Sequence, residues 1–245
     1  MISFFKPKAV LKDLIPTGFV DIHSHLLFGI DDGAKTLDDS QFLMESIKAL
    51  GFGKAITTPH TTPYIWDNTK AGILDKFQEV KAGLPELTET LQLRVASEYL
   101  MDDSFSKRIT EERLLTLQGD YVLVEMSYIN PPMQLFDILF ELISAGYKIV
   151  LAHPERYNFY HNNLEMYKKL KRAGCLFQLN LLSVTGYYGS KVADVAAHLL
   201  QSGQIDFVGS DIHHINHIRG FDAKVKIKDT KPLVEALAKN ALFDF

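Results

Sequence analysis

The sequence predicts an α/β fold in which parallel strands alternate with helices, as a barrel or as a doubly wound sheet. Seven short strand-like runs are separated by helix-like segments. The runs are almost continuously apolar, which is typical of a parallel sheet buried on both faces. With 245 residues and 47% hydrophobic content, the chain can bury one complete core. We therefore expect a single domain over residues 19–245. Residues 1–18 form an N-terminal extension, in which Phe4 and Phe5 are expected to pack on the body of the protein or on a neighbour.

The predicted elements follow one another in a regular order. The strand-like runs begin at Phe19, Ala55, Leu93, Val122, Ile149, Leu176 and Phe207. The helix-like segments cover about residues 40–50, 71–82, 133–145, 164–173 and 192–201. Glycine is typical of the position just after a helix, and Gly51, Gly146, Gly174 and Gly203 stand in such positions. Pro131 and Pro132 are placed to open the third helix, which follows the fourth strand.

Composition and charge exclude several classes of protein. A net charge of −4 and a pI near 6.1 leave no broad basic surface, so we expect no nucleic-acid partner. No apolar run reaches the roughly 20 residues of a membrane-spanning helix, and the N-terminus lacks the basic-then-apolar order of a signal peptide. The single cysteine, Cys175, cannot form an internal disulfide and indicates a reducing compartment. We therefore expect a cytoplasmic protein without membrane insertion.

Six of the seven strand-like runs end near a histidine, aspartate or glutamate that can bind a metal. The first run carries His23 and His25, whose side chains point the same way on a strand and can share one ion. The last run repeats this spacing with Asp211 and His213. The runs between them end in His60, Glu98, Glu125 and His153. Because the carboxyl ends of parallel strands open onto one face, we expect all of these side chains to converge on a single pocket.

Each of these residues also has a purely structural interpretation. A single histidine at a strand end is more often a hydrogen-bonded structural residue, and a glutamate can pair with a basic side chain. However, Glu98 and Glu125 end apolar strands, where an unpaired carboxylate is costly unless a cation neutralises it. Six such strand ends together favour a metal site. The remaining histidines lack a matching partner and are expected at the surface: His161, His198, His214 and His217.

The donor set indicates both the metal and the reaction. Imidazole and carboxylate ligands without thiolate fit manganese, iron or zinc, and disfavour a structural zinc site of the cysteine type. The ligands are too many for one ion, so we expect a cluster of two or three ions that activates a water. A cysteine phosphatase is excluded because Leu181 stands six residues after Cys175, where an arginine would be needed. No Gly-x-Ser-x-Gly motif is present either. Metal-dependent hydrolysis is the predicted chemistry.

Together, the motifs resemble those of the polymerase and histidinol phosphatase (PHP) superfamily. They are Asp21-Ile22-His23-Ser24-His25, Asp31-Asp32-Gly33, Thr58-Pro59-His60, Glu98, Glu125, Ala152-His153-Pro154-Glu155-Arg156-Tyr157 and Ser210-Asp211-Ile212-His213. Within the superfamily, the chain is most similar to manganese-dependent bacterial tyrosine phosphatases that are encoded with capsular and exopolysaccharide genes. The ordered match covers about residues 19–219. It implies a distorted (β/α)7 barrel of the PHP type and a trinuclear metal site.

The resemblance also implies roles for individual residues. The metal ligands would be His23, His25, Asp32, His60, Glu98, Glu125, His153, Asp211 and His213. Asp31 is the alternative to Asp32. Arg156 corresponds to an arginine that binds the phosphate, and Arg219 approximates a second arginine expected shortly after the Asp-x-His motif. The stretch from His214 to Ile218 is longer than the family pattern at that point.

The expected activity is hydrolysis of phosphotyrosine on a protein, with Mn²⁺ as the expected metal and Fe or Zn as alternatives. The resemblance implies that the substrate is the flexible tail of a bacterial tyrosine kinase that regulates capsule or exopolysaccharide synthesis. A small-molecule PHP phosphatase, acting on histidinol phosphate or a similar ester, would share the metal site. An amidohydrolase or TatD-like nuclease also begins with His-x-His, but many amidohydrolases have a lysine where this chain has Glu98 or Glu125. A non-catalytic scaffold is disfavoured because no ligand position is lost.

Overall fold

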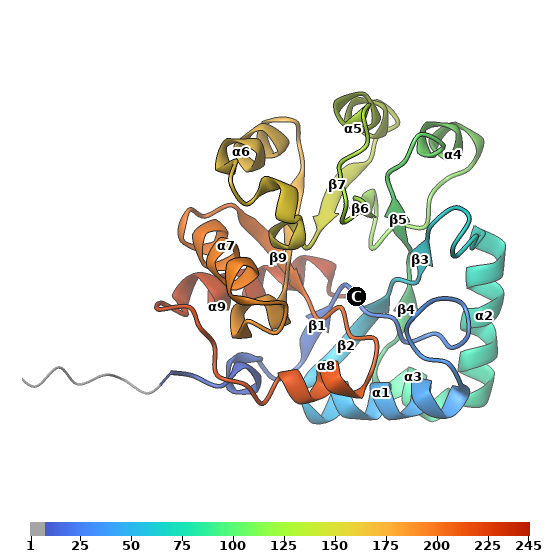
Figure 1. The fold of residues 1–245 in the computed structure, drawn as a ribbon. Coiled ribbons are helices and arrows are strands. Elements are labelled where there is room, and N and C mark those ends of the chain that lie inside the picture. The colour runs from blue at the N-terminus through green and yellow to red at the C-terminus, as the bar shows by residue number, and fades with distance from the viewer. Residues whose placement is uncertain (1–7) are drawn as a thin grey trace, which may run out of the picture.

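The computed structural model describes residues 8–245, in which parallel strands and helices alternate around a common centre (Figure 1). The strands are β1 (Phe19–Asp21), β2 (Phe52–Thr57), β3 (His60–Thr61), β4 (Arg94–Val95), β5 (Glu98–Leu100), β6 (Tyr121–Glu125), β7 (Lys148–Ala152), β8 (Leu176–Asn180) and β9 (Ile205–Gly209). The α-helices are α1 (Leu37–Ala49), α2 (Lys70–Gly83), α3 (Pro85–Thr90), α4 (Phe105–Glu111), α5 (Leu135–Ser144), α6 (Leu164–Arg172), α7 (Ser190–Gln201), α8 (Ile215–Gly220) and α9 (Lys231–Lys239). Short 3₁₀ turns are η1 (Leu11–Leu14), η2 (Pro154–Arg156), η3 (Asn158–Tyr160), η4 (Leu181–Thr185) and η5 (Asn240–Phe243).

Within residues 8–245, these nine strands correspond to the seven predicted from the sequence, because two of the predicted strands are each divided into two. The second is divided into β2 and β3 at Thr58 and Pro59, where proline has no N–H to donate to a sheet. The third is divided into β4 and β5 at Ala96 and Ser97. All pairs are parallel, and the strand order is β1-β2-β4 in one sheet and β3-β5-β6-β7-β8-β9 in the other. The strands therefore follow one another in chain order, as in the predicted distorted (β/α)7 barrel.

The first and last strands meet at a seam that differs from a regular ladder. A parallel bridge joins Ser24 to Ile212 just beyond the ends of β1 and β9. Deeper in the molecule, the side chain of Asn240 lies between the two strands. Its Nδ2 donates to the carbonyls of Val20 and Val208, and its Oδ1 accepts from the N–H of Val208. The side chain thus supplies hydrogen bonds that a direct strand pair would otherwise make.

The five helices predicted from the sequence are α1, α2, α5, α6 and α7, and their ends agree within three residues. Helix α1 begins earlier than predicted because Thr36 caps it. Oγ1 of Thr36 accepts from the N–H of Asp39, and the Asp39 carboxylate accepts from the N–H of Thr36. Among residues 8–245, no helix combines the length and the apolar character needed to cross a bilayer.

Two apolar layers surround the strands. The inner layer comes from residues in or next to the strands, from Leu117 before β6 and from the chain end: Val20, Ile22, Ile56, Ala96, Leu117, Leu123, Val150, Ala152, Phe207 and Phe243. Phe243 is fully buried, and Figure 1 shows the C-terminus at the centre of the ring of strands. A larger layer lies between the strands and the surrounding helices. The carboxyl ends of the strands are left free of this core and carry polar side chains.

The predicted N-terminal extension contacts the C-terminal half of the chain. In its described part, the N–H groups of Leu11 and Lys12 donate to the carbonyls of Ala223 and Phe221, each at 3.0 Å. Leu11 is fully buried. The expected packing of Phe4 and Phe5 concerns residues 1–7, outside the described part.

Candidate metal centre

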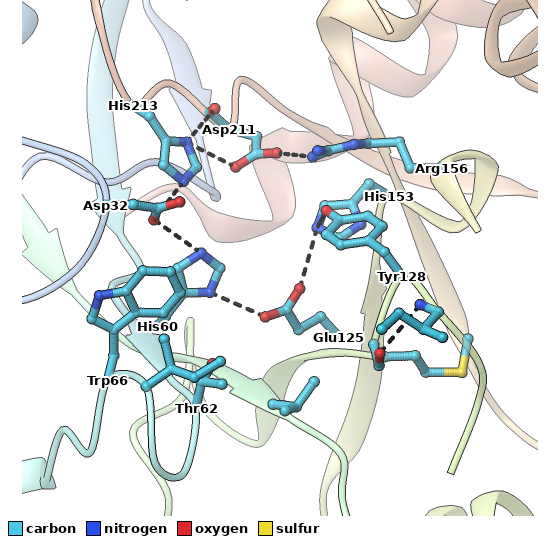
Figure 2. A pocket seen from close by; sticks show the side chains of 15 residues that line it. Asp32, His60, Thr62, Trp66, Glu125, Tyr128, His153, Arg156, Asp211 and His213 are labelled. Atoms are coloured by element: carbon cyan, nitrogen blue, oxygen red, sulfur yellow. Dashed lines mark hydrogen bonds and ion pairs between the residues drawn. The ribbon is translucent and has the colours of Figure 1, made fainter. Parts of the chain in front are cut away.

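The carboxyl ends of the strands bring together all nine residues that the sequence analysis assigned as metal ligands. Figure 2 shows His60, Glu125, His153, Asp211, His213 and Asp32 around one cavity. Their ligand atoms form four overlapping groups, each with members within 4.8 Å of one another. These are His25, Asp32, His60 and His213; His23, Glu98 and His153; His23, His25 and Asp211; and His60, Glu98 and Glu125. Residues far apart in the sequence therefore form one continuous cluster.

The two histidines of the first motif are oriented by partners outside the cluster. Nδ1 of His23 lies 2.7 Å from Oε1 of Gln178, and Nδ1 of His25 lies 2.8 Å from Oδ2 of Asp31. Both Nε2 atoms are then directed toward the centre of the cluster, where they lie 3.3 Å apart. A partner on one ring nitrogen selects the tautomer that leaves the other nitrogen free to bind a metal. This arrangement fits a pair of metal-ligating imidazoles.

The base of the first motif is held to the last strand by Asp21. Its carboxylate accepts from the N–H of Ser210 at 2.9 Å and from Oγ of Ser210 at 2.5 Å. Burial raises the pKa of Asp21 to about 6, although the contacts with Ser210 oppose this shift. The pair ties β1 to β9 directly beneath the cluster, so the ligands of both strands keep one relative position.

Glu98 is the central carboxylate of the cluster. Its Oε2 lies 3.1 Å from Nε2 of His23 and 3.1 Å from Nδ1 of His60, while its Oε1 lies 3.1 Å from Nε2 of His153. Burial raises the pKa of Glu98, but the nearby His23 and His60 outweigh burial, and the net pKa lies well below its ordinary value. A buried carboxylate whose two oxygens face histidines from different strands is a suitable ligand for metal ions.

The choice between the two neighbouring aspartates follows from their contacts. Oδ1 of Asp32 lies 3.4 Å from Nε2 of His60 and 3.3 Å from Nε2 of His213, so Asp32 belongs to a ligand group. Asp31 instead orients His25 from behind. The turn requires Gly33, because a Cβ at that position would lie 2.3 Å from the carbonyl oxygen of His25. Asp31 therefore contacts the candidate ligand His25, and Asp32 itself belongs to a candidate ligand group.

Two of the assigned ligands have a left-handed backbone. His153 has φ 34° and Asp211 has φ 51°. Such a conformation costs a non-glycine residue about 1–3 kcal/mol, and it occurs mainly where function requires it. The N–H of Asp211 donates to the carbonyl of His23 at 2.7 Å, which holds the strained residue in place. In both cases the kink follows a strand and directs the side chain into the cavity.

Arg156 lies on η2 at the edge of the same cavity (Figure 2). Its Nη1 donates to Oδ2 of Asp211 at 2.6 Å. The guanidinium lies over the ring of Tyr128 at 4.8 Å and over the ring of Tyr188 at 4.1 Å. The neighbouring Glu155 makes other contacts, since its Oε1 accepts from the N–H of Asn180 and from Oγ of Ser183. The guanidinium is therefore held at the cavity, where it can reach an anion.

Arg219 is placed differently. It lies exposed on α8, its guanidinium contacts Oδ1 of Asn216 at 3.4 Å, and it does not line the cavity.

The expectation for His217 is wrong: this residue was expected at the surface, but it is buried. Burial lowers the pKa of His217 to about 3, so the ring is neutral and its Nδ1 accepts from the N–H of His213. His217 thus supports a ligand residue, which a helix-like sequence stretch gave no means to predict.

Strand β8, the sixth strand predicted from the sequence, supplies two residues that the ligand pattern missed. Gln178 contacts His23, as described above, and Nδ2 of Asn180 donates to Oδ2 of Asp211 at 2.8 Å. Strand β8 is the one predicted strand that does not end near a candidate metal ligand. The available signal was two buried amides at alternate positions of an otherwise apolar strand. Their role is to orient ligands.

The donor set fits metal ions. Nδ1 of His60 is buried and makes no hydrogen bond within residues 8–245. Nevertheless, it lies 3.1 Å from Oε2 of Glu98 and 3.1 Å from Oε1 of Glu125. Burial lowers the pKa of His60, but Glu98 and further acidic contacts outweigh burial and raise the pKa to about 10. A ring nitrogen and two carboxylate oxygens that converge without hydrogen-bond geometry form a suitable site for a cation. The cavity of about 430 Å³ leaves room for a substrate.

Comparison with known proteins places the chain in a family. Residues 19–227 match the family model described as capsular polysaccharide synthesis, CpsB/CapC. The putative tyrosine-protein phosphatase CapC of Staphylococcus aureus is 27% identical over 213 residues, which cover 86% of this chain and 83% of CapC. The tyrosine-protein phosphatase CpsB of Streptococcus pneumoniae is 26% identical over 203 residues, which cover 80% of this chain and 84% of CpsB.

Solved structures agree with the barrel fold. One match comes from the crystal structures of YwqE from Bacillus subtilis and CpsB from Streptococcus pneumoniae, which are described as metal-dependent tyrosine phosphatases. Its TM-score is 0.75 at 25% identity, and it covers 82% of this chain and 84% of that chain. The histidinol phosphate phosphatase of Lactococcus lactis shares the fold, with a TM-score of 0.53 at 13% identity over 94% of this chain and 95% of that chain. Because the family model spans most of the sequence, the chain belongs to the CpsB/CapC family of capsular polysaccharide synthesis.

Proposed function

We propose that this protein is a metal-dependent tyrosine-protein phosphatase that acts in capsular polysaccharide synthesis. The observation that carries the proposal is the cluster of nine candidate metal ligands. Six of them, namely Asp32, His60, Glu125, His153, Asp211 and His213, line one cavity together with Arg156. Family membership supports it, since the relatives CapC and CpsB are named tyrosine-protein phosphatases. The barrel of residues 19–245 would be the catalytic domain.

When bound, the ions would supply an activated water and positive charge for the phosphate oxygens. The chain itself holds and orients the reactants. The ligand side chains His23, Glu98 and Asp211 are directed toward the cluster by hydrogen bonds from behind or by burial. Arg156 presents a planar guanidinium that can bind two phosphoryl oxygens in a fork. The leaving group is a phenolate, whose conjugate acid has a pKa of about 10, so a strong general acid is unnecessary.

Manganese is the proposed metal, with two or three ions in the cluster. Nitrogen and carboxylate oxygen donors without thiolate suit Mn²⁺, and they also accept Fe or Zn. The four overlapping ligand groups support more than one ion, because His23, His25, His60 and Glu98 each take part in two of them.

The proposed substrate is a phosphotyrosine-bearing protein, namely the tail of a bacterial tyrosine kinase that controls capsule or exopolysaccharide synthesis. A flexible tail suits a cavity that lies at the open end of the barrel. A cytoplasmic location fits both such a partner and the single cysteine, Cys175.

The proposal is tested by metal analysis of purified protein together with hydrolysis of a phosphotyrosine peptide, a phosphoserine peptide and histidinol phosphate. We expect two or three transition ions per chain, loss of activity on chelation, best recovery in Mn²⁺ and preference for the phosphotyrosine peptide. Preference for histidinol phosphate would identify a small-molecule phosphatase instead. Full activity without stoichiometric metal would refute the metal mechanism.

A further inference from the structure

Two loops place matching pairs of side chains at the mouth of the metal cavity. The loop after β3 carries Ile65 and Trp66, and the loop after β6 carries Tyr128 and Ile129. All four side chains line the cavity, together with the metal-ligand residues and Arg156. Each loop therefore contributes one aromatic ring and one isoleucine.

The aromatic ring of each pair packs on a metal-ligand imidazole. The ring of Trp66 stacks on His60 with centroids 5.0 Å apart and an interplanar angle of 14°. The ring of Tyr128 stacks on His153 with centroids 5.6 Å apart and an angle of 23°. Figure 2 shows the two stacks on opposite sides of Glu125. The loops are thus anchored to the metal centre from two sides.

Both loops also have local hydrogen bonds that order them. Trp66 and Thr62 exchange two backbone hydrogen bonds, at 2.8 and 3.0 Å. In the other loop, the N–H of Ile129 donates to Oγ of Ser127 at 3.2 Å. The isoleucine next to each aromatic ring therefore has a defined position at the rim.

The side chains of the two isoleucines are largely exposed to solvent. Ile65 is 67% exposed and Ile129 is 84% exposed. A single exposed apolar residue needs no explanation, but two that line the same cavity offer apolar surface that a ligand can cover. The cavity is consequently divided into a polar floor of ligands with Arg156 and an apolar mouth.

We propose that Ile65 and Ile129, supported by Trp66 and Tyr128, receive the aryl ring of the substrate and determine selectivity for aryl over alkyl phosphate esters. This inference rests on the proposed phosphatase function. With the phosphoryl group at the ligands and Arg156, the next group outward in phosphotyrosine is a flat apolar ring. In phosphoserine, the peptide backbone follows after one methylene and would bring polar groups to the same apolar walls.

The test compares two non-hydrolysable inhibitors, phenylphosphonate and methylphosphonate, on the metal-loaded enzyme. Ile65→Ser and Ile129→Ser should each weaken inhibition by phenylphosphonate about tenfold, the scale of losing apolar contact in a pocket. Inhibition by methylphosphonate and the metal content should not change. Ile65→Leu and Ile129→Leu should restore most of the phenylphosphonate affinity. Val234→Ser, which removes a half-exposed apolar side chain from α9 away from the cavity, is the matched control.

Two outcomes would overturn the inference. Equal loss of affinity for both phosphonates would mean that the isoleucines only support the loops, and unchanged affinity for both would mean that the ring does not touch them. Neither outcome would show whether the protein hydrolyses phosphotyrosine. Failure of the wild-type protein to hydrolyse any phosphotyrosine peptide would instead refute the proposed function.

Discussion

The guanidinium of Arg156 donates a 2.6 Å hydrogen bond to Oδ2 of Asp211, a residue assigned as a metal ligand. The arginine expected to bind phosphate is therefore joined directly to the candidate metal centre. Burial opposes the charged form of Arg156, but Tyr128, Asp211 and other acidic neighbours outweigh burial and raise its pKa. The side chain therefore keeps its positive charge at the edge of the cavity, where we expect the phosphate to bind.

Arg156→Ala should lower kcat/KM for a phosphotyrosine peptide about a hundredfold or more, because one preorganised contact to the phosphoryl oxygens is lost. At saturating Mn²⁺ the metal-to-protein ratio should be unchanged, since Asp211 keeps the hydrogen bond from Asn180. Arg156→Lys should recover only part of the activity, because an ammonium cannot form the fork. Steady-state kinetics on metal-replete variants measure this. Near wild-type kcat/KM in the alanine variant would remove Arg156 from the active site.

Glu98→Gln should abolish turnover and reduce the bound metal, because an amide cannot replace a carboxylate that faces three histidines. The readout is the metal-to-protein ratio of the folded variant after dialysis. Glu165→Gln, a change of an exposed glutamate on α6, is the control and should retain both metal and activity. A folded Glu98→Gln protein with a full metal complement would contradict the assigned role.

Asn180→Ala should weaken metal binding and lower kcat about tenfold or more, because Asp211 loses an orienting hydrogen bond. Asn180 is a positioning residue, so excess Mn²⁺ should restore part of the activity. Asn216→Ala, at an exposed position on α8, should behave like the wild type. Titration of the apo-protein with Mn²⁺ distinguishes the two variants, and equal affinities would exclude a positioning role for Asn180.

Asn240→Ala should lower the free energy of unfolding by about 2–4 kcal/mol. The substitution removes three hydrogen bonds at the seam and leaves buried backbone groups of Val20 and Val208 without partners. Denaturant unfolding measures the loss, with Asn162→Ala, an exposed site, as the control. If both variants unfolded at the same denaturant concentration, the seam would not depend on this side chain.

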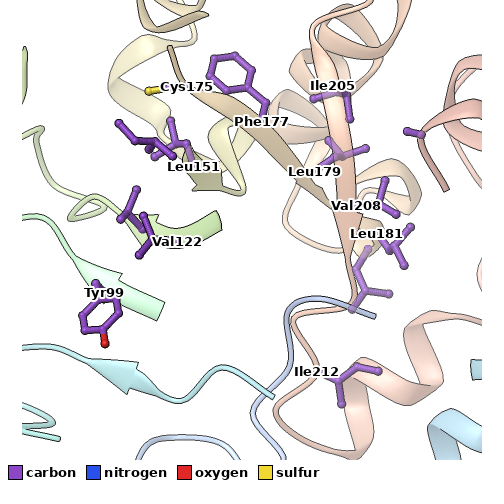
Figure 3. Close-up of a cluster of buried hydrophobic side chains, with 14 of the residues drawn as sticks. Tyr99, Val122, Leu151, Cys175, Phe177, Leu179, Leu181, Ile205, Val208 and Ile212 are labelled. Atoms are coloured by element: carbon purple, nitrogen blue, oxygen red, sulfur yellow. The ribbon is translucent and has the colours of Figure 1, made fainter. Parts of the chain in front are cut away.

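Cys175 should not react with alkylating reagents in the folded protein at pH 8. The thiol is 1% exposed and lies among apolar side chains such as Leu151 and Phe177 (Figure 3). Burial raises its pKa to about 12, so the thiol stays protonated at pH 8 and the nucleophilic thiolate is scarce. Labelling should therefore appear only on unfolding, as mass spectrometry can show. Activity should survive Cys175→Ser, and a folded but inactive variant would reopen a thiol mechanism.

The sequence alone determined the alternation of strands and helices and the positions of most candidate ligands. The reason is local. A continuous apolar run predicts a buried parallel strand, and the carboxyl ends of such strands share one face. Residues such as His60 and Glu125 could therefore be assigned to a common pocket without any knowledge of their contacts. The nine candidate ligand positions follow from this rule together with the resemblance to the PHP superfamily.

Other features were decided only by tertiary contacts. Asp32 rather than Asp31 lies among the candidate ligands because Asp31 turns toward His25, and His217 is buried because it packs behind His213. The seam depends on Asn240, which is 220 residues from its partner Val20. Which of two neighbouring side chains faces a cavity, and which buried groups find partners, depends on elements distant in sequence. Hydrogen-bond partners and burial are properties of the packed molecule, so periodicity and spacing along the chain do not specify them.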